Sequence, residues 1–215
     1  MVIAGICLLV SACGPATVGQ IGSPTATPTP NTLDLSLWTV STVGTGPTAS
    51  AANAGVDLFI PGNAQQDPQR PLMAVNVQGK CKVTGDFDMQ LDYALTTWPA
   101  RNGVRLGLAA GTSSVQRNSN PANADNRYVT DFTGPTTVVE TQDMTGSLRL
   151  SRVGSVITGY YLSKGRWVAI ASTNGSTDPL PYGIAAWTDP AIFGKADVRV
   201  NVKHFVGAPT TSGCP

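Results

Sequence analysis

The feature that most constrains the fold is a strict alternation of apolar and polar side chains over residues 86–95. The apolar members are Phe87, Met89, Leu91, Tyr93 and Leu95, and the polar members are Asp86, Asp88, Gln90 and Asp92. Side chains with a period of two lie on opposite faces of an extended chain, so this run predicts a β-strand with one buried face. The same pattern recurs in 103–109 and 198–203.

The rest of the chain supports an all-β interpretation, because no stretch of twelve or more residues shows helical periodicity. Further strands are expected at 37–43, 56–60, 72–77, 127–132, 137–141, 147–152, 156–162, 167–172 and 182–187. The turns Val153-Gly154-Ser155 and Ser163-Lys164-Gly165 predict two hairpins that join 147–167 into a three-stranded meander. Roughly a dozen short strands in one domain predict a two-sheet sandwich or a barrel.

The N-terminus carries a different signal. An apolar run from Val2 leads into Leu8-Leu9-Val10-Ser11-Ala12-Cys13, which resembles the lipobox of bacterial lipoproteins. The resemblance implies that residues 1–12 are a signal peptide, that Cys13 is lipidated, and that the protein is anchored to a bacterial membrane on its extracytoplasmic side. The first seven residues lack Lys and Arg, which leaves open an upstream start, a buried strand or a short uncleaved anchor.

Residues 13–32 are uncharged, lack aromatic side chains and contain a Thr-Pro repeat. Such a segment cannot bury enough apolar surface to fold, and its prolines favour an extended chain, so it is interpreted as a spacer. Residues 33–206 are then long enough for one domain with a sizeable core. Residues 207–215 form a C-terminal tail.

The four cysteines sort by position. If Cys7 leaves with the signal peptide and Cys13 takes the lipid, Cys81 and Cys214 are left, and an oxidising compartment favours a disulfide between them. That bond would tie the tail back onto the domain. The alternative is two free thiols.

The charge pattern excludes one class of partner. Charged residues make up 13% of the chain and the net charge is +1. Lys and Arg are scattered singly, so no basic patch exists that could hold a phosphate backbone, and nucleic-acid binding is not expected.

Several segments resemble the concanavalin A-like lectin and glucanase superfamily. These are Gly85–Tyr93, Asn102–Leu108, Leu148–Tyr161, Gly165–Trp167 and Val200–Phe205, in the order in which that superfamily has comparable strands. The resemblance covers most of 33–205. It implies an all-β, two-sheet antiparallel jelly-roll sandwich with about six strands in each sheet, of which one face often binds glycans.

Catalysis has little support in the sequence. Glycoside hydrolases of this superfamily resemble one another in a strand with paired Glu residues, whereas Glu140 is the only Glu here. His204 is the only His, and its alternation with Val198, Val200 and Val202 predicts a structural position near the core. No catalytic residue is assigned, and a glycoside hydrolase is the least favoured of the functions considered.

A polar loop at 118–126 is rich in the oxygen ligands that calcium prefers, with Asn123 and Asp125 as candidate ligands. It lacks the spacing of a known calcium motif, and an ordinary polar turn is the alternative. No other cofactor is expected.

Glycan recognition needs aromatic rings that stack on sugars and polar groups that bind hydroxyls. The candidates are Trp98, Tyr128, Tyr160 and Trp187, with Arg101, Asp88 and Asp92 as polar partners. Core or strand packing is the alternative for each ring. The sequence thus favours a lipid-anchored, lectin-like module that binds envelope glycans without cleaving them. The alternative partner is an envelope protein complex, on which the domain would dock as an accessory subunit.

Overall fold

The computed structural model describes residues 33, 37–52, 55–119, 126–132, 137–207, 211–212 and 214. The predicted signal peptide 1–12 and the spacer 13–32 with Cys13 lie outside the described residues, so both stay predictions. In the part of the chain that is described, no helix is long and apolar enough to cross a membrane.

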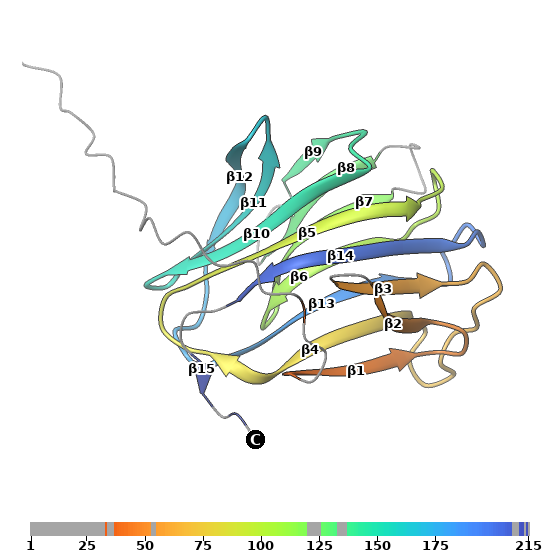
Figure 1. The fold of residues 1–215 in the computed structure, drawn as a ribbon, viewed down its shortest axis with the longest axis horizontal. Coiled ribbons are helices and arrows are strands. Elements are labelled where there is room, and N and C mark those ends of the chain that lie inside the picture. The colour runs from red at the N-terminus through yellow and green to blue at the C-terminus, as the bar shows by residue number, and fades with distance from the viewer. Residues whose placement is uncertain are drawn as a thin grey trace, which may run out of the picture.

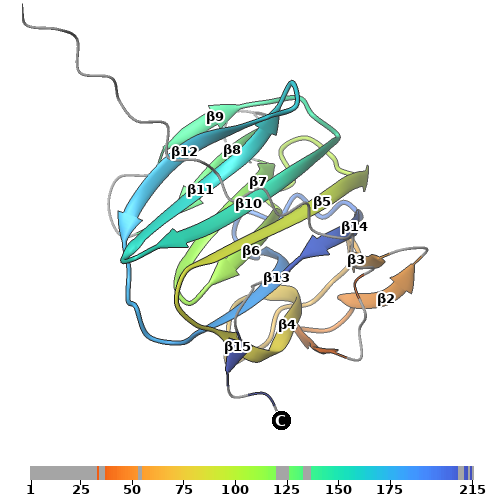
Figure 2. The same cartoon turned by 60° about the vertical axis from the view of Figure 1, so that its left-hand side comes forward.

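Two antiparallel β-sheets pack face to face (Figures 1 and 2). Sheet A has the order β1-β4-β13-β6-β7-β8-β9, and the short β15 also pairs with β4. Its strands are β1 (Trp38–Val43), β4 (Met73–Val83), β13 (Leu180–Thr188), β6 (Arg105–Ala110), β7 (Ser113–Ser119), β8 (Asn126–Asp131), β9 (Val138–Glu140) and β15 (Thr211–Ser212). The predicted all-β sandwich is confirmed.

Sheet B has the order β12-β11-β10-β5-β14-β3-β2. Its strands are β12 (Arg166–Asn174), β11 (Val156–Ser163), β10 (Thr145–Val153), β5 (Phe87–Thr97), β14 (Val198–Val206), β3 (Gly55–Ile60) and β2 (Thr48–Ala52). The central neighbours of both sheets, such as β4 and β13 in sheet A and β5 and β14 in sheet B, are far apart in sequence, which is the connectivity expected of a jelly roll.

The core lies between the sheets and is built by the predicted alternation. The five apolar side chains of β5 are at most 3% exposed, and β5 lies between β10 and β14 in sheet B. Leu106 and Leu108 of β6 face them from sheet A, and the three alternating valines of β14 lie beside them in sheet B, all almost fully buried. The period-two pattern therefore placed these strands and their inner faces correctly.

The two predicted hairpins are confirmed. Val153 pairs with Val156 and Ser163 pairs with Arg166, so each connection is a two-residue turn. Lys164 and Gly165 both have positive φ, at 50° and 74°, as the type I′ turn favoured in tight hairpins requires.

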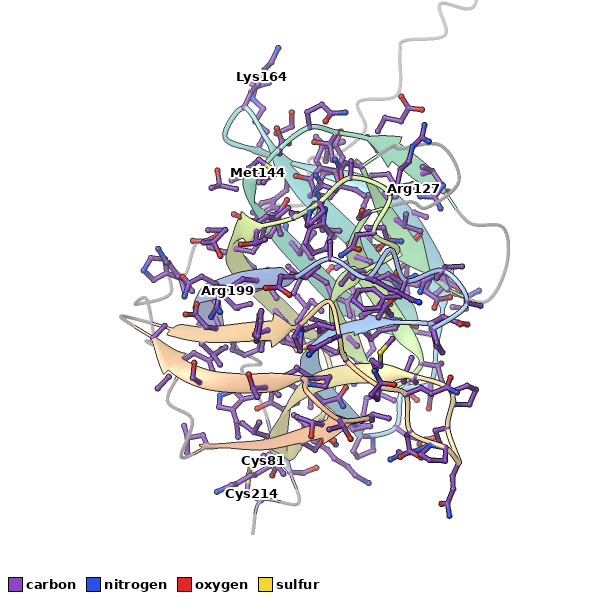
Figure 3. The ribbon with its side chains drawn as sticks, turned by 90° about the vertical axis from the view of Figure 1, so that its right-hand side faces the viewer. Cys81, Arg127, Met144, Lys164, Arg199 and Cys214 are labelled. Atoms are coloured by element: carbon purple, nitrogen blue, oxygen red, sulfur yellow. A yellow bond between two sulfur atoms is a disulfide. The ribbon has the colours of Figure 1, made fainter. Side chains whose placement is uncertain are left out.

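The predicted disulfide between Cys81 and Cys214 is present, with Cα atoms 4.3 Å apart and a sequence separation of 133. Figure 3 labels the pair at one end of the sandwich. The bond holds the tail where β15 pairs with Lys82 and Val83 of β4.

Three strands were not predicted, namely β2, β7 and β15. The end of β7 falls in the segment that we interpreted as a polar loop, because Asn118 and Ser119 belong to this strand. Its sequence hides the alternation, since the inner face of β7 carries the cation of Arg117 beside Val115.

Candidate functional site

The outer face of sheet A, which points away from sheet B, carries side chains in cross-strand rows. The row that we call the charged row consists of Trp187 (β13), Arg105 (β6), Asn118 (β7) and Arg127 (β8). The next row consists of Asn76 (β4), Ala185 (β13), Gly107 (β6) and Gln116 (β7). The third consists of Gln78 (β4), Gly183 (β13), Ala109 (β6) and Ser114 (β7).

The second and third rows contain a hollow of about 330 Å³. Its floor is the backbone of β13 and β6, because Gly183, Ala185 and Ala109 have little or no side chain there. Larger residues at these positions would fill the space. The hollow thus exists because two adjacent central strands carry small residues on the same face.

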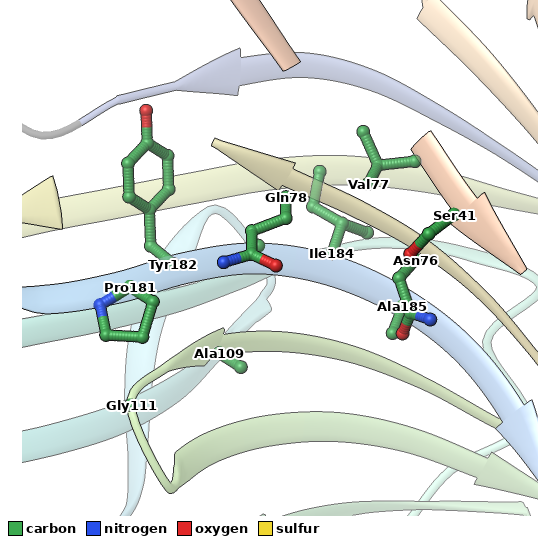
Figure 4. Close-up of a pocket in the computed structure, with 11 residues that line it drawn as sticks. Ser41, Asn76, Val77, Gln78, Ala109, Gly111, Pro181, Tyr182, Ile184 and Ala185 are labelled. Carbon is green, nitrogen blue, oxygen red and sulfur yellow. The ribbon is translucent and has the colours of Figure 1, made fainter. Parts of the chain in front are cut away.

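Hydrogen-bonding side chains form one wall of the hollow. Ser41 of β1 and Asn76 and Gln78 of β4 line it. Figure 4 shows the side-chain amides of Asn76 and Gln78 at the hollow. An amide offers two donors and one acceptor, so this wall can bind vicinal hydroxyl groups in either direction.

The ring of Tyr182 does not belong to the floor. In Figure 4 it points away from Ala109. It packs against Trp38 and Phe205, with ring centroids at 5.4 and 6.0 Å, on the inner side of the sheet. Burial raises the pKa of its hydroxyl above the ordinary value, so this phenol stays neutral.

An aromatic ring stands beside the hollow. Trp187 is half-buried on the outer face, next to Ala185 along β13. Its six-membered ring lies over Gly107, since a Cβ atom there would be 2.7 Å from Cζ3 and 2.8 Å from Cη2. This position, predicted for sugar stacking, is thus an accessible ring beside a polar hollow.

The polar members of β7 complete this face. Gln116 and Asn118 are only 3% and 6% exposed, although both lie on the outer side of the sheet. Gln116 donates a hydrogen bond from Nε2 to Oγ of Ser114 at 2.7 Å. The side chains of Gln116 and Ser114 are therefore fixed relative to the floor.

Two of the candidate stacking rings, Trp98 and Tyr128, are packed in the core instead. The side chain of Trp98 is 7% exposed, and its Nε1 donates to Oδ1 of Asn126 at 2.9 Å. Tyr128 is fully buried, and its hydroxyl lies 2.9 Å from the hydroxyl of Tyr93. Neither ring can stack on a ligand, because both pack around the buried guanidinium of Arg117.

Arg117 explains why these aromatics turn inward. Its side chain is 0% exposed and donates from Nη1 to the Asn118 carbonyl at 2.9 Å and from Nη2 to the Asp143 carbonyl at 3.0 Å. Two rings lie within 6 Å of the guanidinium carbon, a distance at which a cation is attracted to a ring face. The cluster is structural.

The remaining predicted residues are divided between locations. Tyr160, Asp88 and Asp92 lie on the outer face of sheet B, on the opposite side of the sandwich from the hollow. There, Arg149 donates to both carboxylate oxygens of Asp88 at 2.8 and 2.6 Å and lies 4.9 Å from the ring centroid of Tyr160. The structure therefore does not bring these residues together with Trp187.

His204 also differs from its predicted position near the core. A register shift in β14 after Lys203 leaves the ring exposed, and its Nδ1 lies 3.1 Å from Oδ2 of Asp92. Ser147 donates to the other oxygen of this carboxylate at 2.5 Å. Because Asp92 separates Ser147 from His204, the histidine cannot act as the base for this serine.

Other candidates contribute less. Arg101 is exposed in the connection between β5 and β6, with a φ of 58°. The calcium candidates Asn123 and Asp125 lie outside the described residues. Among the residues that are described, no group of three or more His, Cys, Asp or Glu side chains could hold a metal ion.

The sequence indicated Trp187 as a candidate binding residue, but it did not indicate the hollow. Asn76, Gln78 and Gln116 are ordinary polar members of strands, and the small residues of β6 and β13 carry no chemical signal. An alternation in which the outward positions are Gly or Ala on two neighbouring strands, as at Ala109 of β6 and Ala185 of β13, could have indicated a site where a ligand approaches the backbone.

Comparisons with known structures support the architecture. An alginate lyase from Corynebacterium sp. aligns with a TM-score of 0.61 at 12% identity, over 84% of this chain and 96% of that one. The alginate lyase from Klebsiella pneumoniae aligns with 0.55 at 11% identity, over 85% and 98%. The chain has a concanavalin A-like jelly-roll fold.

A domain whose structure was solved with a bound glycan is also similar. The exoplasmic/lumenal domain of VIP36, in its Ca²⁺/Man3GlcNAc-bound form, aligns with a TM-score of 0.50 at 9% identity, over 80% of this chain and 85% of that one. Neither the family models nor the curated proteins that were searched match this chain by sequence. At such identities the likeness shows the fold alone.

Proposed function

We propose that this jelly roll binds saccharide chains, without cleaving them, across the outer face of sheet A. The observation that carries the proposal is the polar hollow of about 330 Å³, floored by backbone, with the indole of Trp187 over Gly107 on the same face of the sheet. Sugars present a ring face to an aromatic side chain and a belt of hydroxyls to amides, and both kinds of partner lie here side by side. The jelly-roll neighbours include a glycan-bound domain and alginate lyases, which supports a saccharide as the ligand.

The lining of the hollow favours binding over cleavage. None of the described residues that line it is Asp, Glu, His, Lys or Arg. Glycoside cleavage by an acid and a base needs two ionisable groups that converge on one bond. Tyr182 is the one ionisable residue of the lining, and its phenol lies on the inner side of the sheet.

The rival hypothesis of docking on a protein complex has less support. The large apolar residues that are exposed among those described are Leu37, Val40, Val138, Met144, Val153, Val156 and Val168. They are spread over elements of both sheets, and none of them lines the hollow. The proposed ligand is therefore a saccharide.

A lipid anchor at Cys13, followed by the 13–32 spacer, would present this face to envelope glycans. The disulfide supports an oxidising, extracytoplasmic compartment. Labelling with radioactive palmitate in a bacterial host tests the anchor. Incorporation that is lost in Cys13→Ser would support it, and equal incorporation in the variant would contradict it.

The binding test is a glycan array probed with the full chain, followed by calorimetry on the best ligand. Trp187→Ala should weaken binding at least tenfold, whereas Trp167→Ala, a half-buried tryptophan on β12 of sheet B, should leave it unchanged. No binding to any glycan at millimolar concentration would exclude the proposal. Shortening of the polymer during incubation would show cleavage instead.

A further inference from the structure

The charged row lies at the edge of the hollow. Arg105, Asn118 and Arg127 are in register on three neighbouring strands, with Trp187 next to Arg105. Strands lie about 4.8 Å apart, so the two arginines start about 10 Å from each other on either side of Asn118. Their flexible side chains can converge on a group bound above Asn118.

Among the residues that the structure describes, no carboxylate forms an ion pair with either arginine. The ion pairs described in the structure join Arg70 to Asp67, Arg149 to Asp88 and His204 to Asp92, all outside this row. Glu140 is opposite Arg127 in register on β9, yet the two do not approach within the 4.0 Å of an ion pair. Within the described part of the chain, the two cations of the row therefore have no ion-pair partner.

Two buried polar atoms of the row also lack hydrogen bonds. Oδ1 of Asn118 is buried without a partner, on a side chain that is only 6% exposed. Nε of Arg127, directly opposite in register, is buried without a partner as well. Buried polar groups are almost always hydrogen-bonded in proteins, so the row has an unused acceptor beside an unused donor; Nε of Arg117 and Oδ1 of Asn201 are the other such atoms among the described residues.

We propose that the charged row binds the anionic substituent of an acidic saccharide, a carboxylate or a sulfate ester. This inference rests on the proposed function and names its ligand class. A guanidinium donates parallel hydrogen bonds to the oxygens of such a group, and the two arginines approach it from opposite sides. Trp187 stacks on the sugar ring that carries the anion.

The hollow and the charged row would then hold different units of one chain. The uncharged hollow, with Asn76 and Gln78, takes a unit by its hydroxyls, and the charged row takes the next unit by its anion. Binding of an acidic polymer should therefore weaken as salt rises, since partly exposed charges are screened.

The test compares the full chain with dextran, dextran sulfate, polygalacturonate and its methyl ester by calorimetry. Dextran and dextran sulfate differ only in the sulfate, and polygalacturonate and its ester differ only in the carboxylate charge. We expect at least tenfold tighter binding to one acidic member than to its neutral match. The preferred pair identifies the anion as sulfate or carboxylate.

Substitutions in the charged row test whether this row causes the preference for an acidic polymer. Arg105→Gln with Arg127→Gln should remove the preference and its salt dependence, whereas Arg166→Gln, an exposed arginine at the start of β12, should change neither. Asn118→Asp keeps both arginines and nearly the same shape, and places a carboxylate between them. It should also abolish the preference, and it provides a variant that folds if the double variant does not.

The outcomes separate the two proposals. Equal binding of neutral and acidic polymers would overturn the inference and leave saccharide binding standing. An acid preference that survives in both row variants, or that falls equally with Arg166→Gln, would also overturn it. Absence of binding to all four polymers and to the glycan array would exclude both proposals.

Discussion

Trp187 lies across Gly107 so closely that a methyl group at position 107 would be 2.7 Å from Cζ3 of the indole. The contact joins two central strands, β13 and β6, on the outer face of sheet A. The smallest residue of β6 thereby determines where the one aromatic ring of the candidate site can lie.

Gly107→Ala should therefore displace the indole and weaken saccharide binding several-fold. In a Trp187→Ala background the same change should have no further effect on binding, because the side chain that it strikes is gone. A double-mutant cycle measured by calorimetry checks this. Equal losses in both backgrounds would show that Gly107 acts independently of the ring.

Loss of Arg117 should destabilise the protein by about 3 kcal/mol or more, because its removal leaves buried carbonyls unpaired and a cavity between the sheets. Urea unfolding of Arg117→Ala measures this. Arg166→Ala, at an exposed strand start, should stay within about 0.5 kcal/mol of the parent chain. A similar small effect at Arg117 would contradict the structural role given to the cluster.

The buried tyrosines beside Arg117 predict that the free energy of unfolding falls at alkaline pH. Burial, and secondly the neighbouring Tyr128, raise the pKa of Tyr93 above its ordinary value of 10.0. The folded state then holds the proton more tightly than the unfolded state. The stabilisation is complete below pH 10 and is lost as pH rises further, by up to about 1.4 kcal/mol per pH unit.

Tyr93→Phe should flatten this dependence. Unfolding free energies of the two proteins between pH 9 and 11 provide the measurement, and the general loss of stability common to both proteins cancels in the difference. Parallel curves for parent and variant would show that Tyr93 does not carry the alkaline effect.

Reduction of Cys81–Cys214 should release β15 and lower the unfolding free energy by about 2–4 kcal/mol. The variant with both cysteines changed to serine should match the reduced parent and should not respond to reductant. Saccharide binding should persist in both, since the hollow lies on other residues. A reductant effect on the serine variant would locate the sensitivity elsewhere.

Tyr160→Ala tests whether the predicted site residues on the outer face of sheet B take part in saccharide binding. Its ring lies on the outer face of sheet B beside Arg149, so saccharide affinity should not change. A loss comparable to that of Trp187→Ala would show that the sheet B face also binds the ligand.

Strands could be predicted from the sequence wherever buried and exposed side chains alternate. Phe87 to Leu95 and the valines of β14 follow a period of two because each has one face in the core, and the turn at Lys164 and Gly165 requires residues that tolerate positive φ. The disulfide followed from counting cysteines. These features depend on local chemistry, which a sequence displays.

The candidate site depends on nonlocal register, which a sequence does not display. Asn76 of β4 shares a surface with Gln116 of β7 only because the distant strand β13 pairs with both β4 and β6. Trp98 follows the end of β5 and is nevertheless buried, because Asn126 of β8 accepts its indole hydrogen bond. Arg117, a cation inside the sandwich, could not be expected from a pattern that places charges outside.

The floor of the hollow has an evolutionary consequence. Gly183, Ala185 and Ala109 are at or near the lower limit of side-chain size, so almost every substitution there adds atoms. Random mutation can therefore make the hollow smaller but can scarcely make it deeper. A lineage that stops using the hollow should lose it by steady infilling, and its persistence in related chains would be a record of continued use.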